Sequence, residues 1–144
     1  MLKVRGGPVH LLKVLMVDDI EAMRKEFIGI FRDYVADARI DEAPDVISAI
    51  ERCQTEKPPY DVIFTDVNMP AVSGLRLIPF LRNHEAYRKT PLIVMSTLTG
   101  RTDIARALEL GATAYLTRPF QREYFEIIYL AYITPILRRK QLSV

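Results

Sequence analysis

Four short apolar runs in this chain each end in polar residues that can carry chemistry. They are LLKVLMV (11–17) before Asp18-Asp19, YDVIFT (60–65) before Asp66, LIVM (92–95) before Ser96-Thr97, and AYLT (114–117) before Arg118-Pro119. Runs rich in Val, Ile and Leu with little alternation are typical of buried strands in a parallel sheet. Ligands bind at the carboxyl ends of such strands, so the pattern predicts one pocket that gathers these groups. Such a pocket suits a divalent cation beside a phosphorylated carboxylate.

Apolar residues recur at helical spacing between these runs, which predicts a helix after each strand. The expected helices lie at about 20–34, 45–53, 74–81, 100–110 and 124–132, with a short second strand at 38–43. We expect Asp45 to cap the second helix and Gly111 to end the fourth. Pro79 should kink the third helix unless it lies in the first turn, and Pro135 should perturb the end of the last helix. The alternation predicts an α/β fold with a doubly wound, five-stranded parallel sheet.

The length of 144 residues fits one domain, and we expect a flexible N-terminal arm at 1–10, a domain at 11–140 and a C-terminal tail at 141–144. The net charge of +2 is too small to argue for nucleic acid. No apolar stretch approaches the ~20 residues of a membrane span. Cys53 is the only cysteine and is expected to pack in a helix of a cytoplasmic protein. His10 and His84 lack the spacing of zinc ligands.

Residues 12–139 resemble the receiver domain of two-component response regulators. The resemblance is carried by the acid pair Asp18-Asp19, by TDVNMP around Asp66 together with Gly74 eight residues past it, by Ser96 thirty residues past Asp66, and by GATAYLTRPF (111–120). Each fragment alone is a weak signal, but four fragments in this order and at this spacing are a strong one. The resemblance implies a flavodoxin-like receiver (βα)5 fold with strand order 2-1-3-4-5.

The resemblance also implies a phosphoryl-accepting site that uses Mg²⁺. Asp66 would be the phosphoacceptor, a carboxylate that attacks phosphorus to form a mixed anhydride. Asp19, Asp66 and the backbone carbonyl of Asn68 would bind the ion directly, and Asp18 would act mainly through a bound water. In a simpler interpretation, Asp18-Asp19 only caps the next helix and Asp66 only ends a strand. That interpretation does not explain their joint spacing.

A hydroxyl and an aromatic residue are implied to form the switch. Ser96 would hydrogen-bond a phosphoryl oxygen, and Tyr115 would then turn inward, as a two-state element biased by a local change in charge. Thr97 is the competing hydroxyl, and ordinary strand-end packing is the alternative for all three residues. Leu98, two residues past Ser96, should shield the acyl phosphate from water, which predicts slow self-dephosphorylation.

Arg118 is the main departure from the family pattern, which has lysine immediately before this proline. Arginine keeps the positive charge but brings a larger planar fork, so the replacement is not neutral. Arg118 can pair with phosphate, or it can point outward and leave the site short of one cation. The resemblance implies a cis bond between Arg118 and Pro119.

The function implied is that of a signalling receiver, which is not an enzyme in the usual sense although it would catalyse its own phosphorylation and dephosphorylation. A sensor histidine kinase or phosphotransfer protein would supply the phosphoryl group. The face of the fourth helix, fifth strand and fifth helix would then control a target protein or output domain, with homodimerisation left open. A pseudo-receiver scaffold that works without phosphorylation is the alternative, supported by Arg118. A phosphatase of haloacid-dehalogenase type is disfavoured because it needs an aspartate where Asn68 stands.

Overall fold

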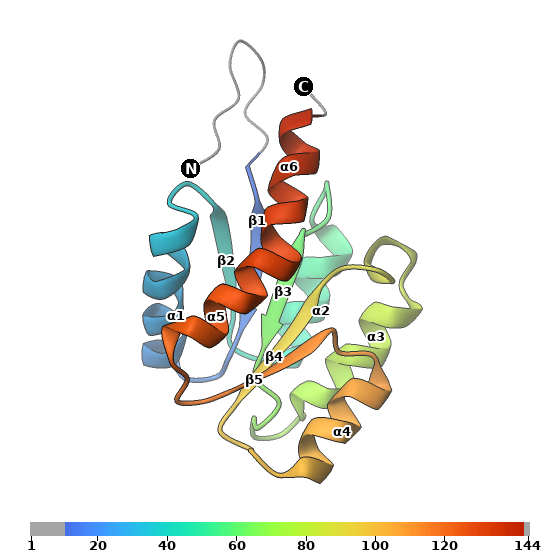
Figure 1. Cartoon of the computed structure of the whole chain (residues 1–144). Coiled ribbons are helices and arrows are strands. Elements are labelled where there is room, and N and C mark those ends of the chain that lie inside the picture. The colour runs from blue at the N-terminus through green and yellow to red at the C-terminus, as the bar shows by residue number, and fades with distance from the viewer. Residues whose placement is uncertain (1–10, 143–144) are drawn as a thin grey trace.

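The computed structural model describes residues 11–142, which form a parallel sheet of five strands covered by helices on both faces (Figure 1). The strands are β1 (Lys13–Val17), β2 (Arg39–Ala43), β3 (Val62–Thr65), β4 (Leu92–Ser96) and β5 (Ala114–Thr117). They pair in the order β2-β1-β3-β4-β5, and every pair is parallel. The predicted fold class and strand order are therefore confirmed. The expected arm at 1–10, with His10, lies outside the described residues.

The helices are α1 (Glu21–Tyr34), α2 (Val46–Thr55), α3 (Leu77–Asn83), α4 (Arg101–Leu110), α5 (Arg122–Ile128) and α6 (Thr134–Leu142). Two 3-10 turns, η1 (Gly74–Arg76) and η2 (Glu85–Tyr87), flank α3, and a π-helical segment, η3 (Tyr129–Ile133), joins α5 to α6. α1 and α5 cover one face of the sheet, and α2, α3 and α4 cover the other (Figure 1). None of the helices in the described part of the chain is long and apolar enough to cross a membrane.

The strand residues alternate between two hydrophobic cores, one under each helical layer. In β1, Val14 and Met16 face α1 and α5, whereas Leu15 and Val17 face the α2–α4 side, and all four are fully buried. The core under α1 and α5 contains an aromatic cluster of Phe27, Phe31, Phe64 and Phe125, with ring centroids 4.8–6.4 Å apart. Burial on both faces is the reason that the strands appear in the sequence as continuous apolar runs.

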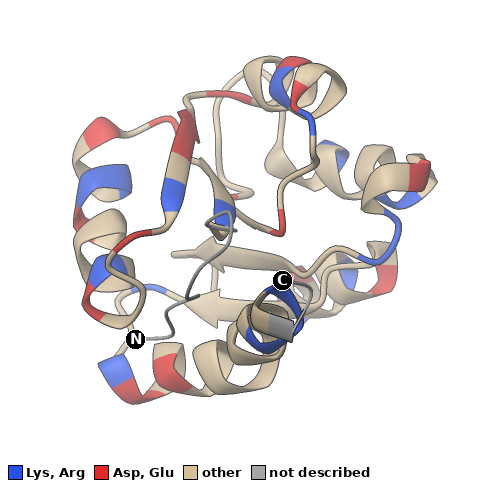
Figure 2. Cartoon of the chain, turned by 90° about the horizontal axis from the view of Figure 1, so that it is seen from above, with Lys and Arg blue, Asp and Glu red and all other residues tan. Residues whose placement is uncertain are grey.

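The expected caps and the first-turn proline agree with the structure. The side chain of Asp45 accepts a hydrogen bond from the backbone N–H of Ser48, and Gly111 ends α4 in the left-handed conformation with φ 118°. Pro79 is the third residue of α3 and so lies in the first turn, where a missing N–H is tolerated. The condition for a kink at Pro79 is therefore not met. Basic and acidic residues alternate along the ribbon around the molecule, without gathering in one region (Figure 2).

The last helix continues past Pro135, and its π-helical segment η3 ends two residues before this proline. The helical segments α5, η3 and α6 are contiguous from Arg122 to Leu142, so the helix continues well beyond the expected end at 132. A π-helical bond to the carbonyl of Leu130 would need an N–H at residue 135, which proline lacks. The hydroxyl of Thr134 donates to that carbonyl instead, at 2.9 Å. α6 also extends two residues beyond the domain boundary expected at 140.

Candidate functional site

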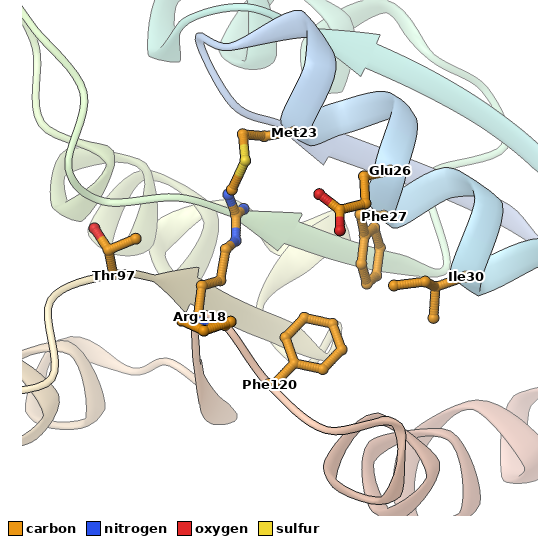
Figure 3. Close-up of a pocket in the computed structure, with 8 residues that line it drawn as sticks. Met23, Glu26, Phe27, Ile30, Thr97, Arg118 and Phe120 are labelled. Atoms are coloured by element: carbon orange, nitrogen blue, oxygen red, sulfur yellow. The ribbon is translucent and has the colours of Figure 1, made fainter.

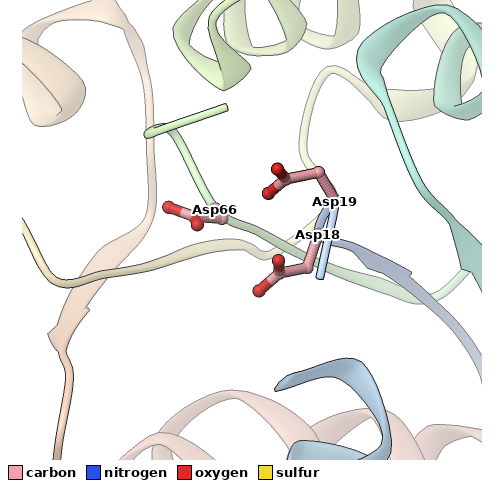
Figure 4. A group of neighbouring side chains, drawn as sticks. All are labelled: Asp18, Asp19 and Asp66. Carbon is pink, nitrogen blue, oxygen red and sulfur yellow. The ribbon is translucent and has the colours of Figure 1, made fainter. Parts of the chain in front are cut away.

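Three carboxylates meet at the carboxyl ends of two neighbouring strands. Asp18 and Asp19 directly follow β1, and Asp66 directly follows β3. The two strands pair in register up to Val17 and Thr65, so these acids come next to one another. Oxygen atoms of all three side chains lie within 4.8 Å of one another, and Figure 4 shows the carboxylates converging. Asp18 is fully buried, Asp66 is 7% exposed and Asp19 is exposed, so the cluster opens to solvent at Asp19.

Backbone hydrogen bonds fix two of these carboxylates. Asp18 Oδ1 accepts from the N–H of Ile20, and Asp66 Oδ1 accepts from the N–H of Asn68, each at 2.9 Å. The Asp66 N–H in turn donates to the carbonyl of Val17 at 2.9 Å, which ties the ends of β1 and β3 together. The two side chains are therefore held in place before any ligand arrives.

Arg118 is the cation that this site already contains. Its Nη1 donates to Asp18 Oδ2 at 2.7 Å, and the side chains of the two partners are 8% and 0% exposed. Its Nη2 is buried and has no hydrogen-bond partner. The peptide bond to Pro119 is cis, as the resemblance implies. Because a buried unpaired donor carries a desolvation cost, Nη2 is a ready donor for an acceptor that enters the site.

Burial is the main influence on the electrostatics of Asp66. Burial raises the pKa of Asp66, and the negative charge of Asp18 adds to that rise. The Asn68 N–H, the Arg118 guanidinium and the Ser96 hydroxyl oppose it without cancelling it. The cluster holds three carboxylates, of which Asp18 is ion-paired with Arg118, and oxygen donors are the ligands that Mg²⁺ prefers. The acidic cluster therefore fits a divalent cation.

Gly74 allows the chain after Asp66 to fold back closely. A Cβ at this position would lie 1.9 Å from the carbonyl oxygen of Asp66 and 2.8 Å from the Cα of Val67. The Gly74 N–H and the Ser73 hydroxyl both donate to the Val67 carbonyl, at 3.2 and 3.1 Å. The spacing signal at Gly74 thus has a steric cause, which is close approach to the backbone of the candidate phosphoacceptor.

The two hydroxyls after β4 have different surroundings. Ser96 is fully buried, and its Oγ accepts from the Leu98 N–H at 3.1 Å. The Tyr115 hydroxyl donates to the Leu98 carbonyl at 2.7 Å, so both residues hold the same loop. Thr97 instead lines a cavity of about 320 Å³ between α1 and the segment after β5, together with Arg118 and mainly apolar side chains (Figure 3). The geometry places Ser96 on the Asp66 side and Thr97 on the α1 side.

Two residues near the acidic pair were not singled out by the sequence. Arg24 Nη1 donates to the carbonyl of Asp18 at 2.7 Å, and its Nε donates to Glu42 Oε1 at 2.9 Å. In the sequence Arg24 looks like part of the solvated face of a helix, and Glu42 sits in a short strand without an apolar run. No spacing rule links them to the site.

His84 and Cys53 lie outside the acidic cluster. His84 caps η2, with Nδ1 accepting from the Ala86 N–H at 3.2 Å. Cys53 is buried in α2, and burial raises the pKa of its thiol to about 12, which makes it a poor nucleophile. Among residues 11–142, the acidic cluster at β1 and β3 is the one group of potential metal ligands.

Comparison with known proteins gives matches over most of the chain. The family model for the response regulator receiver domain matches residues 14–128. Protein PilG of Pseudomonas aeruginosa is 30% identical over 112 residues, which are 78% of this chain and 80% of that protein. Chemotaxis protein CheY-3 of Vibrio cholerae is 29% identical over 109 residues, 76% of this chain and 82% of that protein. A crystal structure of V. cholerae CheY4 superposes with a TM-score of 0.75 at 28% identity, covering 85% of this chain and 99% of that one.

Other relatives are much longer than this chain. A protein-glutamate methylesterase/protein-glutamine glutaminase of Anaeromyxobacter dehalogenans is 34% identical over 115 residues, but the match spans only 31% of its length.

The receiver domain of the P. aeruginosa sensor histidine kinase PA1611, solved with a magnesium ion in its active-site cleft, shares the fold with a TM-score of 0.75 at 23% identity, covering 87% of this chain and 99% of that one. The match of the family model, the strand order and the acidic cluster agree, and this chain belongs to the response regulator receiver domain family of two-component systems.

Proposed function

We propose that this receiver accepts a phosphoryl group on Asp66 in the presence of Mg²⁺. The donor is a phosphohistidine of a sensor histidine kinase or phosphotransfer protein. The single observation that carries the proposal is the acidic cluster itself. Three carboxylates with oxygens within 4.8 Å face one guanidinium, and the pKa of Asp66 is raised by burial. Such a cluster has no structural benefit without a cation, because the carboxylates repel one another.

The reaction is a transfer between two nucleophiles. A carboxylate oxygen of Asp66 forms a bond to phosphorus while the bond from phosphorus to the donor nitrogen breaks, and that nitrogen keeps the electron pair. The proposed ligands of Mg²⁺ are Asp19, Asp66 and the Asn68 carbonyl, with Asp18 acting through water, and the ion supplies charge neutralisation. Arg118 then offers its unpaired Nη2 to a phosphoryl oxygen while its Nη1 stays on Asp18.

The proposed switch runs through the loop after β4. The Ser96 hydroxyl, which accepts from the Leu98 N–H, turns to the new phosphoryl oxygen. Because the Tyr115 hydroxyl is bonded to the Leu98 carbonyl, movement of the loop is passed to β5 and to the start of α4. The neighbouring surface carries exposed apolar side chains on α4 and α5, such as Leu108, Tyr124 and Ile127, which suit contact with a target protein, an output domain or a second copy. We also place the protein in the cytoplasm, consistent with its one buried free cysteine.

Intact mass spectrometry tests the proposal directly. The protein is incubated with a small acyl phosphate, with and without Mg²⁺, beside an Asp66→Asn control. We expect one phosphoryl group to be added only when both Mg²⁺ and Asp66 are present. Absence of phosphorylation in a folded parent that binds Mg²⁺ would contradict the proposal.

A pseudo-receiver scaffold is the second candidate, and one observation favours it. The cation in the lysine position, Arg118, is bonded to Asp18, so it is already engaged in the absence of a phosphoryl group. Under this alternative the partner-binding face would be fixed. Binding of a partner would then be the same for the parent protein and for Asp66→Asn under phosphorylating conditions.

Leu98 supports a slow loss of the phosphoryl group. Its side chain is half-buried and packs against the core under α2–α4, in the loop that directly follows Ser96. Truncation in Leu98→Ala should open that route and speed dephosphorylation several-fold. Equal lifetimes for the variant and the parent, followed by intact mass after removal of the donor, would show that Leu98 is no shield.

A further inference from the structure

The turn that carries the acidic pair is held by a partly buried arginine, Arg24, from the first turn of α1. Arg24 Nη1 donates to the carbonyl of Asp18 at 2.7 Å, and Arg24 Nε donates to Glu42 Oε1 on β2 at 2.9 Å. The side chain of Arg24 is 13% exposed, so these bonds form where water competes poorly. The guanidinium thus ties the turn after β1 to the neighbouring edge strand.

The bond to the Asp18 carbonyl bears on the position of Asp19. The carbonyl oxygen of Asp18 and the Cα of Asp19 belong to one planar peptide unit, so a change of ψ at Asp18 would move both atoms together. The Asp18 carboxylate has its own partners in Ile20 and Arg118, and Asp19 is the exposed member of the cluster. Arg24 therefore acts on the member of the pair that is otherwise less constrained.

We propose that Arg24 is a positioning residue for the cation site, which fixes the turn between Asp18 and Asp19 by linking the Asp18 carbonyl to Glu42. This inference rests on the proposed function, because it assumes that the cluster binds Mg²⁺. Arg24 bonds to the backbone of the site, not to its carboxylates. Residues of this kind typically change metal affinity by about 10–100-fold when removed.

The charge and the position of Arg24 have opposite effects on Mg²⁺ binding. Loss of a nearby positive charge should strengthen binding of a cation, whereas loss of the turn's anchor should weaken it. Arg24→Lys keeps the charge but has one terminal nitrogen, which cannot reproduce the two-point fork. Weaker Mg²⁺ binding in both Arg24→Lys and Arg24→Met would therefore identify position, and not charge, as the cause.

Lys25 provides a matched control on the same helix. Its Nζ donates to Glu42 Oε2 at 2.6 Å, but its side chain is 58% exposed and its described contacts reach the acidic turn only indirectly, through Glu42. Lys25→Met removes a positive charge at nearly the same place while leaving the Asp18 carbonyl bonded to Arg24. Glu42→Gln weakens the anchor on β2 without changing Arg24 itself.

The experiment is a titration of each folded protein with Mg²⁺ by calorimetry, together with the rate of phosphorylation by acyl phosphate at low and at saturating Mg²⁺. We expect Arg24→Met to bind Mg²⁺ about tenfold more weakly, Arg24→Lys and Glu42→Gln to fall between it and the parent, and Lys25→Met to match the parent. At saturating Mg²⁺ the rates should return close to that of the parent, because the defect lies in binding.

Each other outcome decides against the role. If the parent binds Mg²⁺, and Arg24→Met and Arg24→Lys bind it with the same affinity as the parent, the positioning role alone is overturned. A rate that stays low at saturating Mg²⁺ also overturns it, since that result indicates a general structural defect. A parent that does not bind Mg²⁺ overturns the proposed function and this role with it. If Arg24→Met does not fold, Arg24→Lys and Glu42→Gln give the same decision.

Discussion

The buried pair between Arg118 and Asp18 makes the stability of this protein depend on the ionic state of its site. The Arg118→Met variant lacks the guanidinium. The fully buried Asp18 carboxylate then keeps the Ile20 N–H as its remaining partner. Breaking one side of a buried ion pair typically costs 3–5 kcal/mol. Here we expect about 3 kcal/mol, because removal of Arg118 also removes its own buried and unpaired Nη2.

Two changes should restore part of the stability that Arg118→Met loses, and together they identify the unpaired Asp18 carboxylate as the cause of the loss. In the Asp18→Asn/Arg118→Met double variant no charge is left unpaired, so we expect the cost to be lower than the sum of the single costs by about 2 kcal/mol. Mg²⁺ should also stabilise Arg118→Met, since an ion that binds only the folded state at 100 times its Kd adds about 2.7 kcal/mol.

The assay is chemical denaturation of the parent, the two single variants and the double variant, each with EDTA and with Mg²⁺. A loss below about 1 kcal/mol for Arg118→Met, or strict additivity in the double variant, would refute the reasoning. Either result would mean that the pair is formed without being energetically coupled.

Three further predictions concern the stability of the fold. Gly74→Ala should cost about 3 kcal/mol in denaturation, since its Cβ would lie 1.9 Å from the Asp66 carbonyl oxygen; a cost near zero would contradict this overlap. Arg82→Met should cost about 3 kcal/mol, because its guanidinium donates to several carbonyls around β4 and β5, whereas Arg76→Met, at an exposed site, should stay within about 0.5 kcal/mol. Asp45→Ala should destabilise the fold by about 1 kcal/mol at pH values above the ordinary carboxyl pKa of 3.8. Because the cap lowers the pKa of Asp45 in the folded protein, this cost should fade as the pH falls through that lowered pKa. A cost that does not change with pH in denaturation would disprove the role of the charge.

Much of the scaffold could be predicted because it depends on patterns that repeat. Strands buried on both faces leave continuous apolar runs in the sequence, and an N-cap such as Asp45 acts on its own first turn. The convergence of Asp18, Asp19 and Asp66 also followed from the rule that parallel strands end at one edge. The strand order itself came from the family resemblance and not from the residues.

The remaining features depend on side-chain directions and long-range contacts, which spacing does not encode. The sequence left two directions open for Arg118, and its bond to Asp18 is visible only when β1 and β5 are both in place. Arg24 and Glu42 are 18 residues apart on different elements, so no local pattern joins them. The last helix also continues past Pro135, and there the Thr134 hydroxyl donates to the Leu130 carbonyl, a contact that the spacing of apolar residues does not reveal.

The most direct test of the central claim is to locate the phosphoryl group on the chain. The protein is treated with a small acyl phosphate and Mg²⁺. The aspartyl phosphate that forms on the chain is then reduced with borohydride, and the digested peptides are sequenced by tandem mass spectrometry. We predict that Asp66 alone is reduced, and that no residue is reduced when Mg²⁺ is replaced by EDTA. Reduction at Asp18 or Asp19, or no reduction in a protein that binds Mg²⁺, would contradict the account.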